Sequence, residues 1–312
     1  MSPRVHAYTL LLVTVIIWGA AAPIIKFTLG EFPPVLFLFY RFAISAGAAL
    51  AMALVIGFKL PSDRKILLLT LVYGLLTSTI SLGLVFLGLE RTTAVNASLI
   101  GVVGPILVTV AGVLFLREHV TGREKLGIGI AVGGSTLTIL EPLLRNTDSA
   151  NLLGNMLVFA SLLVGVLTTV MAKVLLRDHV ETATVTSISF FIGFLTFIPI
   201  TLFAYPPNEM VSQIQQAPLS YHLGVFYMAL LSGNLAYFLW HKAQKTIEIG
   251  EAALFGYLGP VFAIPLAVLW LKEELNTTFI FGAIIIAVGV FIAERKRSTP
   301  QRLSGHRLVH HH

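Results

Sequence analysis

Long apolar runs recur along almost the whole chain, and no other feature of the sequence constrains its fold as strongly. Each run has roughly 20 residues, the length of helix that crosses a hydrocarbon core of about 30 Å. Charged residues make up only 12% of the 312 residues, whereas an ordinary soluble domain carries about 25%. The runs are continuous and do not alternate apolar with polar residues, which excludes a transmembrane β-barrel. The sequence therefore predicts an all-α membrane protein with almost no extramembrane domain.

Polar breaks divide the apolar stretches into ten expected transmembrane helices. Their ranges are 8–29, 34–57, 66–89, 94–116, 125–141, 151–176, 182–204, 220–240, 251–271 and 277–293. Several breaks are only a few residues long, so neighbouring helices are expected to pack as antiparallel hairpins. The first run lacks a small-residue cleavage site, and we interpret it as a permanent helix and not as a signal peptide.

Lysine and arginine are distributed unevenly between alternate loops. The richer set lies at residues 4, 59–65, 117–125, 177, 242–245 and 295–307, and the poorer set holds Arg91, Arg145 and Lys272. Because cytoplasmic loops are enriched in basic residues, the imbalance predicts that both termini are cytoplasmic. The pI near 9.6 has the same explanation, so no nucleic-acid partner is expected.

The second half of the chain repeats features of the first. A shift of 155 residues aligns Gly104 and Pro105 with Gly259 and Pro260. Each copy holds five expected helices, and an odd number forces the second copy to enter the membrane upside down. Inverted repeats are common in secondary transporters, whose solute sites lie near the midplane where the repeats meet.

These features predict two inverted five-helix repeats that together form the membrane domain. The first repeat is expected at residues 1–141 and the second at 151–294, followed by a polar tail at 295–312. The tail ends in His310, His311 and His312, a run typical of a purification tag, and it plays no part in the functional argument.

Several motifs of the first repeat resemble those of a known family. They are Trp18 to Pro23 with Lys26, then Tyr40, Arg41 and Phe42, then Gly104 with Pro105, and Leu116 to His119. In this order they resemble the EamA-type unit of the drug/metabolite transporter superfamily, although the second copy has Gly165 where the first has Trp18. The resemblance implies a carrier of small metabolites such as amino acids, nucleosides or quaternary amines, with export as the expected direction and the inner membrane as the location.

Arg41 is the first candidate for solute binding. It lies inside the second expected helix, where an uncompensated arginine costs at least about 2.5 kcal/mol. One interpretation is a clamp for an anion or a carboxylate, because the guanidinium offers a bidentate fork. The alternative is a structural arginine that snorkels outward or binds a helix-end carbonyl or a carboxylate such as Glu90.

Lys26 and Lys173 occupy related places in the two copies, because a shift of 147 residues aligns them. The inversion puts Lys26 near the outer side and Lys173 near the cytoplasm. An ionisable role towards solute or proton is one interpretation, and anchoring at the membrane interface is the other.

The paired glycines and prolines indicate cavity-lining kinks. A proline inside a helix removes one backbone hydrogen bond, and the freed carbonyl needs a neighbour or a wet cavity. Matching interrupted segments in the two halves point to a transport site. We therefore expect Gly104, Pro105, Gly259 and Pro260 to line the cavity, as hinges or as static kinks.

Polar and aromatic side chains on other spans complete the candidate site. The remaining candidates for substrate binding are Tyr73, Ser78, Asn96, Asn234 and Tyr237. Aromatic walls with a few polar groups suit a small solute, but serine and threonine also join helices and tyrosine also marks the interface. His241 is expected in a loop, with a proton relay as the alternative, and Glu273 is expected to be solvated.

Other functional classes lack support in the sequence. The absence of cysteine excludes thiol catalysis, disulfides and cysteine metal sites, and no ATP-binding loop or hydrolase motif occurs. No cofactor or metal is expected. No buried Asp or Glu is expected inside the helices to carry a coupling proton, and Glu90 and Glu141 at the outer ends are the nearest candidates. The sequence predicts a secondary transporter that moves a small metabolite by alternating access, with protons as the coupling ion under consideration. Uptake or exchange is the nearer alternative, and an intramembrane enzyme, a lipid scramblase or a sensor is a more distant one.

Overall fold

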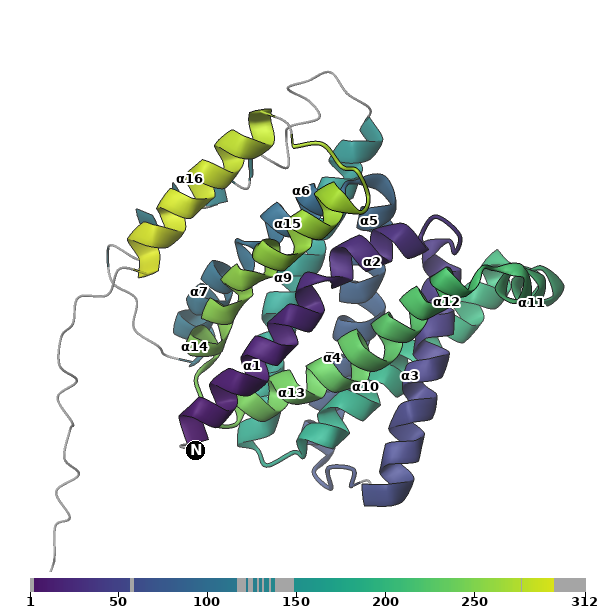
Figure 1. The fold of residues 1–312 in the computed structure, drawn as a ribbon. Coiled ribbons are helices and arrows are strands. Elements are labelled where there is room, and N and C mark those ends of the chain that lie inside the picture. The colour runs from purple at the N-terminus through teal and green to yellow at the C-terminus, as the bar shows by residue number, and fades with distance from the viewer. Residues whose placement is uncertain are drawn as a thin grey trace, which may run out of the picture.

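The computed structural model describes residues 3–56, 59–116, 149–275 and 277–294, together with isolated residues between 122 and 137. Every element within these ranges is helical, and none is a strand. The helices pack side by side into one bundle (Figure 1). The expected span at 125–141 lies mostly outside the described residues, and the polar tail lies wholly outside them.

The first half of the bundle contains three helices that are interrupted along their length. Its elements are α1 (Pro3–Gly19), α2 (Ala21–Thr28), α3 (Pro34–Ile56), α4 (Arg64–Gly74), η1 (Leu75–Ser81), α5 (Leu82–Arg91), α6 (Ala94–Gly101) and α7 (Gly104–Leu116). The element η1 is a π-helix that joins α4 and α5 into one membrane-length rod.

The second half has the same kinds of element. They are α9 (Ser149–Arg177), α10 (Thr182–Ala204), α11 (Pro207–Gln216), α12 (Leu219–Phe226), η2 (Tyr227–Leu235), α13 (Ala236–Gln244), α14 (Ile249–Ala253), η3 (Leu254–Leu258), α15 (Gly259–Leu269) and α16 (Thr277–Glu294). The element η2 is again a π-helix, and η3 is a 3₁₀ helix.

Seven helical rods among the described residues are long and apolar enough to cross a membrane, and each coincides with an expected span. They are Pro3–Thr28, Pro34–Met52, Arg64–Arg91, Ala94–Phe115, Asn151–Arg177, Thr182–Ala204 and Leu219–Gln244. Shorter apolar helices at Phe255–Leu269 and Ile280–Gly289 occupy the last two expected ranges. The all-α prediction is confirmed, and the described chain supplies seven of the ten expected spans at full length.

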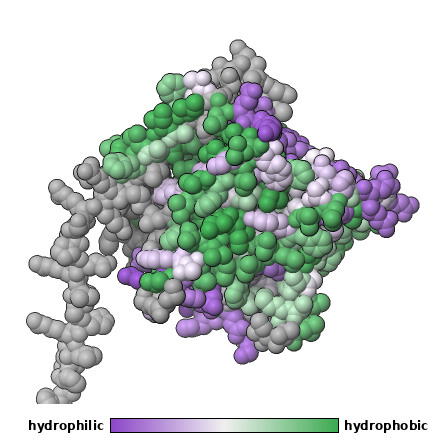
Figure 2. Space-filling model, viewed as in Figure 1, coloured by the Kyte–Doolittle hydropathy of each residue, from purple (hydrophilic) through white to green (hydrophobic). Residues whose placement is uncertain are grey.

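The outer surface of the bundle is apolar, as a lipid-facing surface must be. Figure 2 shows apolar residues over the middle of one face and polar residues gathered towards its edges. Phe203 is 96% exposed and Leu54 is 80% exposed, an arrangement that hydrocarbon tolerates and water does not. Helix α11 was not expected; none of its residues is buried, and it lies at the edge of the bundle (Figure 1).

A phenylalanine core holds the long helices together. The rings of Phe37 on α3 and Phe86 on α5 have centroids 4.9 Å apart, and those of Phe42 on α3 and Phe197 on α10 are 5.6 Å apart. Phe37, Phe42 and Phe86 are fully buried. The bundle therefore has a packed interior around which the interrupted helices are arranged.

The interruptions occupy matching positions in the two halves. The π-helices η1 and η2 lie in the third helix of each half, and the breaks before Gly104 and Gly259 lie in the fourth. Single turns of π-helix are frequent at functional sites, and broken helices at membrane depth occur where they line a cavity or are buried in protein.

Candidate solute cavity

A cavity of about 210 Å³ lies inside the bundle, between the two halves. Helices α1, α4, η1 and α7 from the first half and α9 and α13 from the second half line it. The lining residues are Trp18, Tyr73, Thr77, Ser81, Gly104, Val108, Leu162, Gly165, Val166, Thr168, Thr169, Ala172, Tyr237, Trp240, His241 and Gln244.

Three aromatic rings form one wall of the cavity. The centroid of the Trp18 ring lies 5.2 Å from that of Tyr237 and 5.2 Å from that of Trp240. The indole Nε1 of Trp18 donates a hydrogen bond to the carbonyl of Ser232 on η2, at 3.0 Å. This bond fixes the tryptophan across the junction of the two halves.

Gly165 occupies the position in the second half that Trp18 occupies in the first half. Glycine leaves open the space that a tryptophan side chain would fill. A Cβ added at Gly165 would meet only the Ser81 Oγ, at 3.8 Å. The difference between tryptophan and glycine at equivalent positions makes the cavity asymmetric. Sequence comparison of the halves shows this difference, but only the structure places both residues in the cavity wall.

A hydrogen-bonded chain of three side chains runs from the cavity into the protein. The hydroxyl of Tyr73 lies 3.0 Å from His241 Nε2, and His241 Nδ1 lies 3.0 Å from Thr186 Oγ1. Thr186 donates its only hydroxyl proton to the carbonyl of Thr182, at 3.0 Å. With its hydroxyl proton used in this way, Thr186 accepts from His241 Nδ1–H, and in a neutral imidazole Nε2 then accepts from the Tyr73 hydroxyl.

His241 is therefore hydrogen-bonded at both ring nitrogens. It belongs to α13 and is 2% exposed, so the expectation of a loop residue was wrong. The expected helix ends at residue 240, where the apolar run stops. Helix α13 continues to Gln244, because the polar side chain of His241 has buried hydrogen-bond partners. Nothing in the local sequence shows Thr186, which lies 55 residues away.

Two polar groups in the cavity wall retain free hydrogen-bonding capacity. The Oγ1 of Thr77 and both the Oε1 and Nε2 of Gln244 are buried without a hydrogen-bond partner among the described residues. An unsatisfied buried polar group costs about 1–3 kcal/mol. Both side chains belong to the cavity lining.

A second pocket, of about 380 Å³, adjoins the cavity through Gln244, which lines both. Its other lining residues are Lys173, Leu176, Arg177, His179 and Lys245. We call this pocket the cationic vestibule. It lies at the C-terminal end of α9 and α13, where the sequence places the richer set of basic residues.

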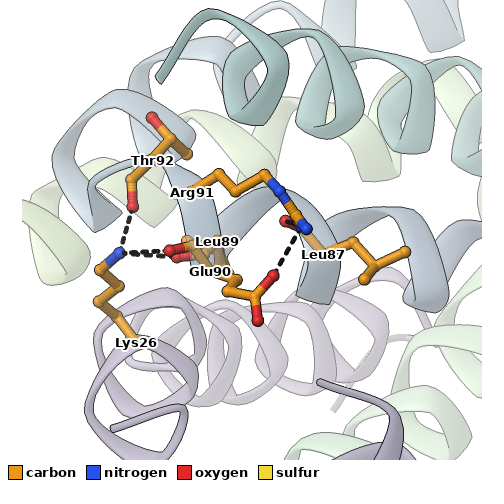
Figure 3. Close-up of polar contacts among 6 residues, drawn as sticks. All are labelled: Lys26, Leu87, Leu89, Glu90, Arg91 and Thr92. Carbon is orange, nitrogen blue, oxygen red and sulfur yellow. Dashed lines mark hydrogen bonds and ion pairs between the residues drawn. The ribbon is translucent and has the colours of Figure 1, made fainter. Parts of the chain in front are cut away.

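Lys26 and Lys173 make equivalent contacts at opposite ends of the bundle. Lys26 Nζ donates to the carbonyls of Leu89, Glu90 and Thr92, at 2.8, 3.3 and 2.6 Å, as Figure 3 shows. The same figure shows Arg91 directed away from Lys26, bonded to the Leu87 carbonyl at 2.9 Å and paired with Glu90 at 2.6 Å.

Lys173 Nζ donates to the carbonyls of Gln244 and Ile247, at 2.5 and 2.6 Å. Each lysine thus binds the carbonyls at the C-terminal end of the third helix of its half. A cation at a helix C-terminus stabilises the helix. The geometry assigns both lysines a structural contact, and Lys173 in addition lines the vestibule.

Glu273 joins the two halves at the Lys26 end of the bundle. Its carboxylate accepts hydrogen bonds from the backbone N–H groups of Ala94 and Val95, both at 2.8 Å. A carboxylate at a helix N-terminus satisfies free amides and the helix dipole. Glu273 was expected to be solvated. The structure leaves it partly exposed, and its carboxylate also binds backbone groups that lie 178 and 179 residues away in the sequence.

Arg41 lies one layer behind the cavity wall. It is 1% exposed, and its Cζ lies 5.5 Å from the Phe42 ring centroid and 5.6 Å from the Phe86 ring centroid. It neither snorkels outward nor pairs with Glu90, which binds Arg91. Within the described part of the chain, its Nε and Nη1 have no hydrogen-bond partner.

The structure brings only part of the predicted site into the cavity. Tyr73, Tyr237 and Gly104 line it, whereas Arg41, Ser78, Asn96, Asn234, Pro105, Gly259, Pro260 and Lys26 do not. Asn96 begins α6 beside its Thr93 cap, and the Asn234 Nδ2 donates to the Ser45 carbonyl at 3.1 Å. Helical position alone does not tell which face of a buried helix meets the cavity, and this limits the sequence prediction.

Among the described residues, no group of three histidine, aspartate or glutamate side chains is placed to hold a metal ion. The cavity offers hydroxyl, imidazole, amide and indole groups, and this set suits an organic solute with polar and apolar parts.

Comparisons with known proteins show which family the chain belongs to. The EamA-like transporter family matches residues 6–140 and 152–294. The uncharacterized transporter YyaM of Bacillus subtilis is 25% identical over 93% of this chain and 94% of its own length. A probable amino-acid metabolite efflux pump of Escherichia coli is 24% identical over 91% of this chain and 93% of its own.

The chain has the same fold as a protein of known crystal structure. The TM-score between the two is 0.65, at 16% sequence identity over 93% of this chain and 98% of that one. The family match and the apolar rods make this a multi-pass protein of the inner (plasma) membrane. Two family matches cover nearly the whole chain, and the chain belongs to the EamA-like transporter family.

Proposed function

We propose that this protein is a secondary transporter that carries a small metabolite through the cavity between its two halves. The observation that carries the proposal is the cavity itself, which both halves line and in which Thr77 and Gln244 hold unfilled hydrogen-bonding groups. Aromatic rings beside free polar groups suit a solute that is partly apolar. The similar efflux pump supports an amino acid or related compound, and export.

The proposed architecture is ten transmembrane helices in two inverted five-helix repeats, residues 1–141 and 151–294. Matching π-helices and matching breaks before Gly104 and Gly259 support it. The two lysines support the inversion, because Lys26 and Lys173 bind the ends of equivalent helices yet lie far apart. Gly154 on α9 packs against Gly88 and Arg91, beside the Lys26 contacts, and Lys173 lies roughly 28 Å further along the same helix by its rise per residue.

In this architecture both termini are cytoplasmic, as the basic loops indicate. The cationic vestibule then opens to the cytoplasm, and the contacts of Lys26 and Glu273 close the outer end. Rocking of one repeat against the other exposes the cavity to each side in turn. Gly104 and the π-helices are the proposed flexible points. Pro105, Gly259 and Pro260 maintain the kinks. His241 is the proposed group for proton coupling because it lines the cavity and is hydrogen-bonded at both ring nitrogens.

The test is solute loss from proteoliposomes loaded with a pooled metabolite mixture, measured by mass spectrometry with and without a proton gradient. The informative variant is Gly165→Trp, because the cavity offers space at this position and a tryptophan fills it. Gly101→Trp is the matched control, since a Cβ at Gly101 meets nothing within 4 Å and the residue is on the exposed surface.

We expect selective, saturable loss of one class of solute from the unmodified protein and from Gly101→Trp, and none from correctly folded Gly165→Trp. Dependence on the gradient establishes coupling to protons, and its sign gives the direction of transport. Equal flux in the two variants contradicts the cavity as the pathway. Absence of selective flux from folded protein contradicts transport and favours an enzyme, a scramblase or a sensor.

A further inference from the structure

A buried positive charge without a charged partner stands behind the aromatic wall. Arginine keeps its proton in proteins, and Arg41 is fully enclosed. Among the side chains that the structure describes, no Asp or Glu is buried, and the one ion pair, between Arg91 and Glu90, is on the surface. The rings of Phe42 and Phe86 give Arg41 cation–π contacts, which leave its charge in place.

Arg41 is close enough to the cavity to act on what enters it. Tyr237 lines the cavity and lies within electrostatic reach of Arg41. A Cβ added at Gly233 on η2 would lie 3.6 Å from Arg41 Nη2, and the neighbouring Ser232 carbonyl holds the cavity residue Trp18. One layer, made of Tyr237 and the π-helix η2, therefore separates the guanidinium from the cavity, and packed protein of low dielectric constant screens a charge only weakly.

The approach to the cavity has the same sign. Lys173, Arg177 and Lys245 line the cationic vestibule together with His179, and none of its described lining residues is acidic. Asp178 lies next to Arg177 in the chain but is exposed and not part of the lining. A cleft lined by charges of one sign and walled by apolar groups concentrates counter-ions.

We propose that the solute carries a carboxylate, which lies towards Tyr237 and Arg41 while its apolar part lies against Trp18 and Trp240. This deepens the proposed function and rests on it. A single guanidinium behind the wall matches a single negative charge better than a doubly charged phosphate. The vestibule draws the anion towards the cavity, and the field of Arg41 holds it there.

The tryptophans give a direct readout of the charge in the cavity. The chain has three; Trp18 and Trp240 line the cavity, and Trp270 instead packs on Phe27 with ring centroids 4.9 Å apart. A Trp270→Phe background therefore reports fluorescence from the cavity alone. The probes are iodide, caesium and neutral acrylamide as collisional quenchers at low ionic strength, each calibrated against free N-acetyltryptophanamide.

We expect the calibrated quenching constant for iodide to exceed that for caesium at least threefold. Arg41→Gln should bring the two within a factor of about two without changing the acrylamide value, and Arg41→Lys should keep most of the difference. Arg64→Gln, which removes an exposed arginine at the start of α4, should change nothing. A calibrated iodide constant no larger than that for caesium in the unmodified sequence overturns the proposal, even if no Arg41 variant folds.

A transport experiment separates the two proposals. The liposome pool includes matched pairs of a carboxylic acid and its primary amide, each pair identical in the rest of the molecule. Selective flux of carboxylates over their amides, by at least tenfold, supports the inference. Selective flux of amides or amines overturns it and leaves the transporter function intact, whereas no selective flux of any solute defeats the transporter function itself.

Discussion

At the scale of single residues, polar side chains of the bundle have one role at the ends of helices and another at the cavity. Lys26, Lys173 and Glu273 each satisfy backbone groups that end or begin a helix. In hydrocarbon no water replaces such a bond, so these residues are expected to act through stability. Arg41 and Gln244 have polar atoms that no side chain satisfies, and we expect them to act through the solute.

Replacing Lys173 by methionine should lower the free energy of unfolding by about 1–3 kcal/mol, because the carbonyls of Gln244 and Ile247 lose their donor. Lys26→Met should destabilise less, since Lys26 is partly exposed, and the exposed Lys65→Met serves as the control. Thermal unfolding in detergent measures all three. A loss of stability in Lys65→Met as large as that in Lys173→Met contradicts the assigned contacts.

The Tyr73–His241–Thr186 chain predicts the tautomer of His241. Nitrogen-15 spectra of the imidazole at neutral pH should show a neutral ring with the proton on Nδ1, because Thr186 can only accept from it. Tyr73→Phe should remove the bond to Nε2, lower stability by about 1 kcal/mol and leave the Nδ1 proton in place. A proton on Nε2 in the unmodified protein contradicts this chain of hydrogen bonds.

At the scale of helices, glycine sets how closely α5 and α9 approach. A Cβ on Gly154 would lie 2.8 Å from backbone atoms of Arg91 and Thr92, and one on Gly88 would lie 3.0 Å from the Gly154 carbonyl. Backbone at this distance cannot move aside as a flexible side chain does. Small residues permit such close packing between membrane helices.

Gly154→Ala should therefore destabilise the protein by more than about 1 kcal/mol through overpacking. Gly101→Ala meets nothing within 4 Å and should be neutral or stabilise by up to about 1 kcal/mol, since alanine favours helix. Unfolding in detergent compares the two alanine variants. Equal stability of the two contradicts the tight contact between α5 and α9.

The sequence predicts the long helices well because one physical requirement, a membrane-length apolar run, defines them. The expected 182–204 coincides with α10, and the expected 34–57 differs from α3 by one residue. The π-helices η1 and η2 leave no such signature, because a π-helix differs from an α-helix in its backbone hydrogen bonds and not in the length of the apolar run. The polar helix α11 lacks an apolar run and was missed for that reason.

The candidate site was harder to predict than the helices. Tyr73 and Tyr237 line the cavity, and their role in substrate binding stays a prediction. The hydrogen-bond partners of Glu273 and His241 lie on helices that are distant in the sequence. Contact across a bundle depends on helix rotation, which the period of an almost uniformly apolar helix does not define. Gly165 lines the cavity because α9 packs against η1 and α7, and the sequence does not show this packing.

At the scale of the whole molecule, the central claim is that solute passes through the cavity between the halves. The chain has no cysteine, so a single introduced thiol can be labelled without background. Gly165→Cys places a thiol in the cavity, and Leu167→Cys places one on the outer surface of the same helix, where Leu167 is 42% exposed to lipid. Thiol reagents attack the thiolate, which forms in water and not in hydrocarbon.

The most direct measurement is labelling of both variants in proteoliposomes with a charged, membrane-impermeant thiol reagent, followed by the flux assay. The account predicts that Gly165→Cys is labelled, that an excess of transported solute slows the labelling, and that labelling abolishes flux, while Leu167→Cys stays unlabelled and active. Labelling of Gly165→Cys no faster than that of Leu167→Cys, or full labelling with flux unchanged, would contradict the account.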